Sequence, residues 1–340
     1  MPEQIEQFKH PLVEALDSEL AQDQLEYLRS YFTAISDAMA PNTLRGFTAD
    51  IRQFFQYCRD EGNTPIPAGL STIQKFIRYR ADQGVSAATI ARAISNLSKI
   101  HDVVGVRNEF RSEIIRTDLK AQRRLNRKSS YQAPGIRYAN LREWDNRLAQ
   151  GQDQSLALLR DRALLWLGYD GMLRSEEVAR ADISWIREME DDALLEIPYH
   201  KTSQEKEELV YLSGHTLKIL KAWFAAAGIT HGAIIRSFSL SGKLQDAIHP
   251  NSISKIITKR AVEMGILGAS SHSLRIGATQ DLIERNESNA RIQLAGRWKS
   301  DRMVVHYGRV HDLKTGAMAT MAMDQGRTKS QQSPHSRGDE

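Results

Sequence analysis

The chain has 340 residues and a formal net charge of +4, with 41% hydrophobic and 26% charged residues. These values are close to the averages of soluble globular proteins, so they exclude an extended or wholly disordered chain and leave room for two domains. The single cysteine, Cys58, excludes an internal disulfide framework and a multi-cysteine metal site. No apolar run approaches the roughly 18 to 20 residues of a membrane span, and the N-terminus lacks the pattern of a signal peptide. We therefore expect a cytoplasmic protein.

The charge is sorted along the chain. Residues 1–40 hold two basic and eight acidic residues, a net charge of −6, whereas residues 41–323 carry a surplus of +10. The densest basic stretch is 107–137, with nine basic and three acidic residues. Such a stretch is typical either of a solvated helix face or of a phosphate-binding surface. Residues 324–340 have no large apolar side chain, and we expect them to be a disordered tail.

Two amphipathic helices are predicted in the first half, over 41–61 and from about 86 to 104, with Ser86 as the N-cap of the second. Their polar faces mix arginine, lysine, asparagine and threonine, which suits a reader of the DNA major groove but also an ordinary surface helix. The candidates for DNA contact on these two helices are Arg45, Arg52, Arg92, Asn96 and Lys99.

A basic segment over 126–137 contains Ser-Ser and Pro-Gly and has no apolar period, so it is predicted to be an interdomain linker. Helical segments follow over 141–150 and 154–181. Two short strands, roughly 194–199 and 208–212, then flank a polar turn, and the chain returns to helices from Asn251 onward. The fold class is therefore mainly α with a small β-hairpin or sheet.

The second half contains several isolated cationic and polar motifs. They are Arg174 in GMLRSEEV, Lys201 in YHKTS, His272 and Arg275 in SHSLRIG, and Trp298 and Tyr307 in GRWKSDRMVVHYGR. Each motif alone has an ordinary structural explanation, such as a salt bridge between Arg174 and Glu177 or a tyrosine in the core. No metalloprotease His-Glu-x-x-His, Walker loop or Asp-x-Asp pair is present to support metal- or nucleotide-dependent phosphoryl transfer.

The order and spacing of these motifs are more specific than any one of them. An arginine, a hairpin lysine, His-x-x-Arg, and a tryptophan followed nine residues later by a tyrosine resemble the catalytic signature of the tyrosine recombinases, the phage integrase family. The resemblance is tightest to the Cre-type recombinases of phages and plasmids, and it extends from about residue 20 to about residue 323.

The resemblance implies a C-shaped, two-domain DNA clamp. In this scheme an acidic leader over 1–19 precedes a helical core DNA-binding domain over 20–125, the linker over 126–137, a mostly helical catalytic domain over 138–323 and the tail over 324–340. The encoding replicon would be a phage or plasmid, which places the protein in the bacterial cytoplasm or nucleoid.

The resemblance also implies the chemistry. Tyr307 would attack the scissile phosphate and form a 3′-phosphotyrosine, while Arg174 and Arg275 would bind the non-bridging oxygens. Lys201 would protonate the leaving 5′-oxygen, and His272 would assist proton transfer from the tyrosine. Trp298 can donate its indole N–H but cannot act as a base.

Glu177 matches the supporting carboxylate of the family, with Glu176 as the adjacent alternative. The resemblance implies no cofactor, because the phosphotyrosine conserves the energy of the phosphodiester without ATP or a metal.

The implied partners are double-stranded DNA with an inverted-repeat recombination site and three further copies of the chain, in a homotetramer on two DNA sites that is a monomer or weak dimer off DNA. No membrane is implied. The helix beginning near Asn251 resembles one that reads bases, although Asn251 or Ser252 could equally be its N-cap. The further candidates for DNA contact are Arg123, Arg124, Arg127, Lys128, Asn251, Ser252 and Lys255.

Two other functions remain open from the residues alone. A type IB topoisomerase uses similar tyrosine chemistry to relax DNA without a defined partner site. A catalytically silent DNA-binding regulator would keep the fold and lose the reaction.

Overall fold

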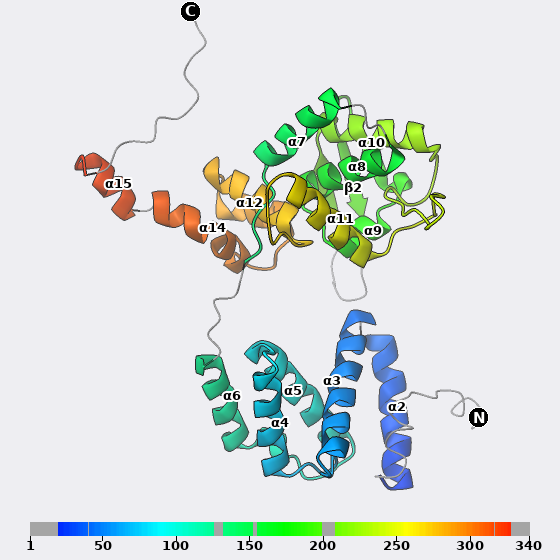
Figure 1. Cartoon of the computed structure of the whole chain (residues 1–340), viewed down its shortest axis with the longest axis vertical. Coiled ribbons are helices and arrows are strands. Elements are labelled where there is room, and N and C mark those ends of the chain that lie inside the picture. Colours follow the sequence, from blue (N-terminus) through cyan, green and yellow to red (C-terminus); the bar gives the residue numbers. More distant parts are fainter. Residues whose placement is uncertain are drawn as a thin grey trace, which may run out of the picture. The chain divides into compact units, whose positions relative to one another are not determined.

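The computed structural model describes residues 20–39, 41–125, 132–151, 155–198, 208–315 and 317–327. The chain divides into two compact units, Met1–Tyr131 and Gln132–Glu340, and each is described by itself (Figure 1). The expected leader, most of the expected tail, and residues 126–131 of the expected linker lie outside the described residues. Both units are mostly helical, as the sequence predicts. None of the helices in the described ranges is long and apolar enough to cross a bilayer.

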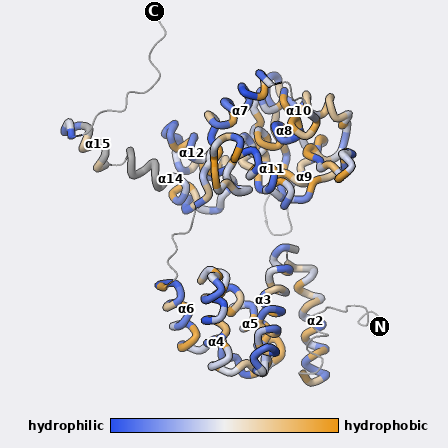
Figure 2. The backbone as a smooth tube through the Cα atoms, viewed as in Figure 1, coloured by the Kyte–Doolittle hydropathy of each residue, from blue (hydrophilic) through white to orange (hydrophobic). Residues whose placement is uncertain are grey.

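The secondary-structure elements in the described part of the first unit are all helical. Its elements are α2 (Gln22–Ala38), α3 (Pro41–Asp60), α4 (Leu70–Asp82), α5 (Ala87–Val103), the 3₁₀ turn η2 (Glu109–Arg111) and α6 (Glu113–Leu125). Hydrophobic and hydrophilic residues alternate along these helices (Figure 2). Their apolar faces meet in an aromatic core, in which Phe54 packs edge-to-face on Phe76 with ring centroids 5.0 Å apart. The two predicted helices are confirmed, and the Ser86 side chain caps α5 by accepting a hydrogen bond from the Thr89 N–H.

The second unit places a small sheet among helices. Its elements are α7 (Tyr138–Gln150), α8 (Leu156–Asp170), α9 (Ser175–Arg180), the 3₁₀ turn η3 (Ile183–Trp185), β1 (Ile186–Glu188), β2 (Ala193–Ile197), β3 (Glu208–Leu212), α10 (Gly214–Ala227), α11 (Pro250–Glu263), α12 (Ser273–Glu284), α13 (Asn289–Gly296), α14 (Arg302–Thr315) and α15 (Ala317–Asp324). The strands form an antiparallel sheet in the order β1-β2-β3. The predicted strand pair is present as β2 and β3, and β1 is an additional edge strand.

One predicted helix is broken. The single helical segment expected over 154–181 is two helices, because α8 ends at Asp170 and α9 starts only at Ser175. Met172 between them has φ +44°, a left-handed conformation that a helix cannot contain. The turn places Arg174 at the N-cap of α9, so the break brings a candidate catalytic residue to a helix start.

The segment that enters the second unit is bound to α12. The Ile136 N–H donates to the Ser273 carbonyl at 2.8 Å, and Arg137 forms ion pairs with Asp281 and Glu284. A Cβ on Gly277, in the middle of α12, would lie 1.8 Å from the Ile136 carbonyl oxygen. Gly277 therefore allows the backbone at Ile136 to lie directly against α12, the helix that carries Arg275.

Gly277→Ala tests this close approach. We expect it to lower the free energy of unfolding of the second unit by about 3 kcal/mol, because a backbone carbonyl must move to admit the methyl group. Tryptophan fluorescence during urea unfolding isolates this unit, since all five tryptophans lie in it: Trp144, Trp166, Trp185, Trp223 and Trp298.

Gly46→Ala in α3 is the matched control. A Cβ at Gly46 meets nothing within 4 Å, so the helix should gain about 1 kcal/mol, measured by circular dichroism. A Gly277→Ala protein with an unchanged tryptophan-detected transition would contradict the close approach.

Candidate active site

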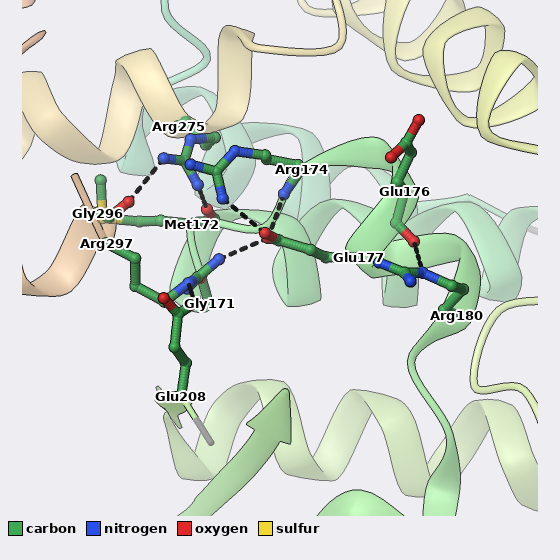
Figure 3. Close-up of polar contacts among 10 residues, drawn as sticks. All are labelled: Gly171, Met172, Arg174, Glu176, Glu177, Arg180, Glu208, Arg275, Gly296 and Arg297. Carbon is green, nitrogen blue, oxygen red and sulfur yellow. Dashed lines mark hydrogen bonds and ion pairs between the residues drawn. The ribbon is translucent and has the colours of Figure 1, made fainter. Parts of the chain in front are cut away.

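Glu177 is the centre of a polar cluster at the start of α9 (Figure 3). Its Oε2 accepts from the Arg174 backbone N–H at 2.8 Å and from Arg297 Nη2 at 2.5 Å, and its Oε1 accepts from Arg174 Nη1 at 2.7 Å. The Glu177 side chain is 9% exposed and that of Arg174 is 45% exposed. Glu177 therefore holds Arg174 from inside the protein while part of the Arg174 guanidinium faces solvent.

Arg275 approaches the same region from the first turn of α12. Its guanidinium donates to the Met172 carbonyl and, at 2.7 Å, to the Gly296 carbonyl, and the residue is 2% exposed. The two acceptors belong to the α8–α9 turn and to the end of α13 (Figure 3). Arg275 thus connects three segments that are far apart in the sequence.

The Trp298 ring packs on Arg275, and the Tyr307 ring packs on Trp298. The guanidinium carbon lies 5.1 Å from the centroid of the Trp298 ring, in cation–π geometry. The Trp298 ring lies 5.8 Å from the Tyr307 ring, centroid to centroid, and Tyr307 on α14 is 9% exposed. A Cβ on Gly296 would lie 2.4 Å from the Trp298 ring, so this glycine makes room for the indole.

The electrostatics of the cluster follow from burial and from its excess of cations. Burial raises the pKa of Glu177, but Arg297 and Arg174 outweigh it and leave the pKa below its usual value. Burial, and then Arg174 and Arg297, lower the pKa of Arg275 to about 10. The cluster therefore holds one buried, ionised carboxylate among three guanidinium groups, and the more exposed Glu208 carboxylate lies 2.9 Å from Arg297 at its edge.

The pKa values of Tyr307 and His272 are shifted in opposite directions. Burial raises the pKa of Tyr307, and the positive charges of Arg275 and Arg174 act against that increase. Burial, followed by the same two arginines, lowers the pKa of His272, which leaves its imidazole neutral and able to accept a proton at pH 7.

Of the six signature residues, the structure brings together Arg174, Arg275, Trp298 and Tyr307, and His272 lies within electrostatic reach of both arginines. Lys201 lies outside the described residues. Glu177, and not the exposed Glu176, has its carboxylate within the cluster.

Within the described residues, no group of three or more His, Cys, Asp or Glu side chains is placed to hold a metal ion.

Arg297 is a member of the cluster that the sequence analysis did not single out. It stands between Gly296 and Trp298 inside a quoted motif, but its ion pair joins it to a carboxylate 120 positions earlier. No local pattern reports such a contact. A buried arginine in a left-handed conformation, with φ +52°, is a signal that only the structure provides.

The candidates for DNA contact fall into different environments. Asn96 is buried and its amide donates to Asp50 at 2.8 Å, while Arg92 pairs with the same carboxylate by two hydrogen bonds of 3.0 Å. Most of the remaining candidates are exposed: Arg45, Arg52, Lys99, Arg123, Arg124, Asn251 and Lys255. Ser252 is half-buried, and Arg127 and Lys128 lie outside the described residues.

The helix α11 begins one residue earlier than expected. Pro250 is its first residue, and His249 is its N-cap, with Nδ1 accepting from the Asn251 N–H at 3.1 Å. The alternative in which Asn251 or Ser252 caps this helix is therefore wrong.

Glu177→Gln tests the central carboxylate. We expect the free energy of unfolding of the second unit to fall by about 3 kcal/mol at pH 7, because two arginines lose their charged partner. The lowered pKa of Glu177 means that its contribution is present above about pH 4.5 and is lost as the pH falls through the folded-state value.

The free energy of unfolding of the second unit should therefore differ less between the wild type and Glu177→Gln in acid than at pH 7. Tryptophan-detected urea unfolding at the two pH values measures both differences. Glu176→Gln, at the exposed neighbouring position, is the control and should change stability little. If the two proteins differed in free energy of unfolding by the same amount at both pH values, the conclusion that Glu177 is ionised in the folded protein would be contradicted.

Comparison with known proteins extends over both units. The phage integrase family profile matches residues 145–314, and that of the phage integrase N-terminal SAM-like domain matches residues 26–104. An integrase/recombinase XerD homologue of Selenomonas ruminantium is 26% identical over 287 residues, 80% of this chain and 83% of that protein. The Cre recombinase of Escherichia phage P1 is 22% identical over 334 residues, 92% of this chain and 95% of that protein.

Solved structures share the fold. A pre-cleavage complex of the XerH site-specific recombinase with its difH substrate has a TM-score of 0.61 at 14% identity, covering 92% of this chain and 93% of that one. A λ integrase tetramer bound to a Holliday junction has a TM-score of 0.58 at 15% identity, covering 88% of this chain and 81% of that one. From the matched profiles and relatives, the chain belongs to the phage integrase family, the tyrosine recombinases, which cut and rejoin DNA strands.

Proposed function

We propose that the protein is a Cre-like, site-specific recombinase that cleaves DNA through a 3′-phosphotyrosine, without a metal or ATP. The observation that carries the proposal is the gathering of four signature residues. Arg174 and Arg275 are both held at the α8–α9 turn, the Arg275 guanidinium lies 5.1 Å from the Trp298 ring, and that ring lies 5.8 Å from the Tyr307 ring. A phenol is a weak nucleophile at neutral pH, and two fixed cations beside it stabilise both a phenoxide and a pentacoordinate phosphorane.

The proposed cleavage step assigns each bond and proton. The Tyr307 oxygen attacks phosphorus and its proton passes to the neutral His272 imidazole. The bond from phosphorus to the 5′-oxygen breaks, and Lys201 protonates that oxygen to give a free 5′-hydroxyl. In rejoining, the 5′-hydroxyl of another strand attacks the phosphotyrosine and the tyrosine leaves.

The arginines serve the phosphate in this scheme. Arg174 and Arg275 present planar sets of N–H donors to the non-bridging oxygens, a task that lysine would perform less well. The indole N–H of Trp298 supplies a further donor. Glu177 keeps Arg174 in place, because it accepts both the backbone N–H and the Nη1 of that residue.

DNA contact is proposed for both units. In the first unit the exposed cations on α3 and α5 would bind phosphates or base edges, and Asn96 would act indirectly by supporting Asp50, which orients Arg92. In the second unit the exposed Asn251 at the start of α11 would reach a base edge, since an asparagine amide pairs well with adenine.

We propose a homotetramer on two inverted-repeat sites. The λ integrase neighbour was solved as a tetramer on a Holliday junction, which is the strand-exchange intermediate that such an assembly would form. The helix α15 has exposed methionines at 318 and 321, which suit packing against a neighbouring copy.

Tyr307→Phe tests the nucleophile. We expect the wild type to form a covalent protein–DNA complex with a nicked duplex that carries an inverted repeat selected by the protein from random-sequence DNA. The variant lacks the attacking oxygen and should bind the duplex normally but form no adduct, as seen on a denaturing gel. Tyr138→Phe, at a half-exposed position, is the control and should form the adduct.

Three outcomes count against the proposal. An adduct with Tyr307→Phe as abundant as that of the wild type would reject the nucleophile. Relaxation of any supercoiled plasmid without sequence preference would favour a topoisomerase, and binding without cleavage by the wild type would favour a regulator.

Lys201→Ala tests the general acid. We expect the cleavage rate to fall by about 10² to 10⁴-fold, because the leaving 5′-oxygen departs unprotonated. A duplex with sulfur in place of that bridging 5′-oxygen should restore the rate, since a thiolate leaves without a proton. Lys218→Ala, at an exposed position on α10, should cleave both substrates normally. A Lys201→Ala defect that persists with the sulfur substrate would contradict the role.

A further inference from the structure

Arg297 is buried more completely than its position in a turn would suggest. Its side chain is 5% exposed, and its Nη1 donates to the Gly171 carbonyl at 2.9 Å while its Nη2 donates to Glu177 at 2.5 Å. Its Nε lies 2.9 Å from a Glu208 oxygen at the start of β3 but makes no hydrogen bond within the described residues. A guanidinium removed from water in this way is unfavourable unless it is paired, and Glu177, whose side chain is 9% exposed, is the more buried of its two carboxylate partners.

Backbone strain is concentrated where Arg297 makes its contacts. Among the described residues, the non-glycine positions with positive φ are Met172, Arg297 and Asn286. The first two lie close together, because the Arg297 side chain donates to the carbonyl of Gly171, next to Met172. The Arg275 side chain donates to the carbonyl of Met172 itself. A left-handed non-glycine residue costs about 1 to 2 kcal/mol, and such strain persists where surrounding contacts hold it. Two arginines therefore clamp the strained α8–α9 turn.

The clamp lies directly before Arg174. The turn Gly171–Met172 sets the direction in which the chain enters α9, and Glu177 then fixes both the backbone and the side chain of Arg174. Glu177 Oε2 accepts from the neutral Arg174 backbone N–H and from the Arg297 guanidinium, while Oε1 accepts from the Arg174 guanidinium (Figure 3). Among the ion pairs of the described residues, a displaced Arg297 would leave the Arg174 guanidinium as the cation paired with this carboxylate. Arg174 would then be drawn toward Glu177 and away from a bound phosphate.

We propose that Arg297 is a positioning residue of the cleavage reaction: by bridging Glu177 and the Gly171 carbonyl, it holds Arg174 and the turn bound by Arg275 in the arrangement that receives the phosphate. The inference rests on the recombinase function proposed above. It assigns Arg297 no contact with the substrate, so its effect passes through Glu177 and the turn.

The test measures single-turnover cleavage of the nicked duplex at saturating protein, and separately the affinity for that duplex. Arg297→Gln should bind DNA with the affinity of the wild type and cleave between about tenfold and about a hundredfold more slowly, because a small displacement of a catalytic group has an effect of this size. Arg297→Lys keeps the charge but lacks the planar fork that joins two acceptors, and it should also be slow. The lysine variant tests the proposal if the glutamine variant does not fold.

Coupling to Glu177 distinguishes positioning from general structural support. If Arg297 acts through Glu177, the double variant Arg297→Gln, Glu177→Gln should cleave no more slowly than the slower single variant. Tryptophan fluorescence establishes that each protein is folded under the assay conditions. The same cycle with Arg297→Lys serves if the glutamine variant unfolds.

Each remaining outcome overturns the inference. Wild-type cleavage by the folded variants would show that the bridge is not needed. A loss of DNA affinity that accounts for the slower reaction would assign Arg297 to binding, and losses that multiply in the double variant would separate it from Glu177. These results can be told apart from a failure of the proposed recombinase function. In that case the wild type would form no covalent protein–DNA adduct, or Tyr307→Phe would form as much adduct as the wild type.

Discussion

Three guanidinium groups gathered around one buried carboxylate are the constraint on which the second unit depends. Burial, and then the like charges of Arg174 and Arg297, disfavour the charged form of Arg275 and lower its pKa. The cluster is stable because Glu177 is ionised and because the carbonyls of Gly171, Met172 and Gly296 accept hydrogen bonds from the arginines. The remaining positive charge favours an anion, so the arginines to which we assign phosphate binding are already arranged in the protein without one.

Most of the fold follows from patterns that are local in the sequence. The period of the apolar residues and the Ser86 cap predict α5 almost to the residue, since a helix of this kind is specified by its own side chains. The strand β1 escaped prediction because three residues are too few to show a period. The break at Met172 also escaped, because nothing in the sequence marks a methionine as left-handed when distant arginines hold its turn.

Some residues of the candidate site could be predicted from the sequence, and others could not. The signature residues were found through a family resemblance that rests on their order, and the structure brings four of them together. Asn96 was a reasonable candidate for DNA contact from its helical face, but the buried Asp50 holds it inside, and a helical period does not reveal a hydrogen-bond partner on another helix. Arg297 shows the same limit, since its role depends on a carboxylate 120 residues away.

The contact of Ile136 and Arg137 with α12 has a mechanical consequence. The chain that joins the two units is fastened, at its described end, to the helix whose first turn carries Arg275, and Gly277 lets the two backbones lie in direct contact. A displacement of Ile136 or Arg137 would therefore act directly on α12. Arg275 and Asp281, the residue that pairs with Arg137, lie about two turns apart on α12, so one rigid helix connects these two contacts.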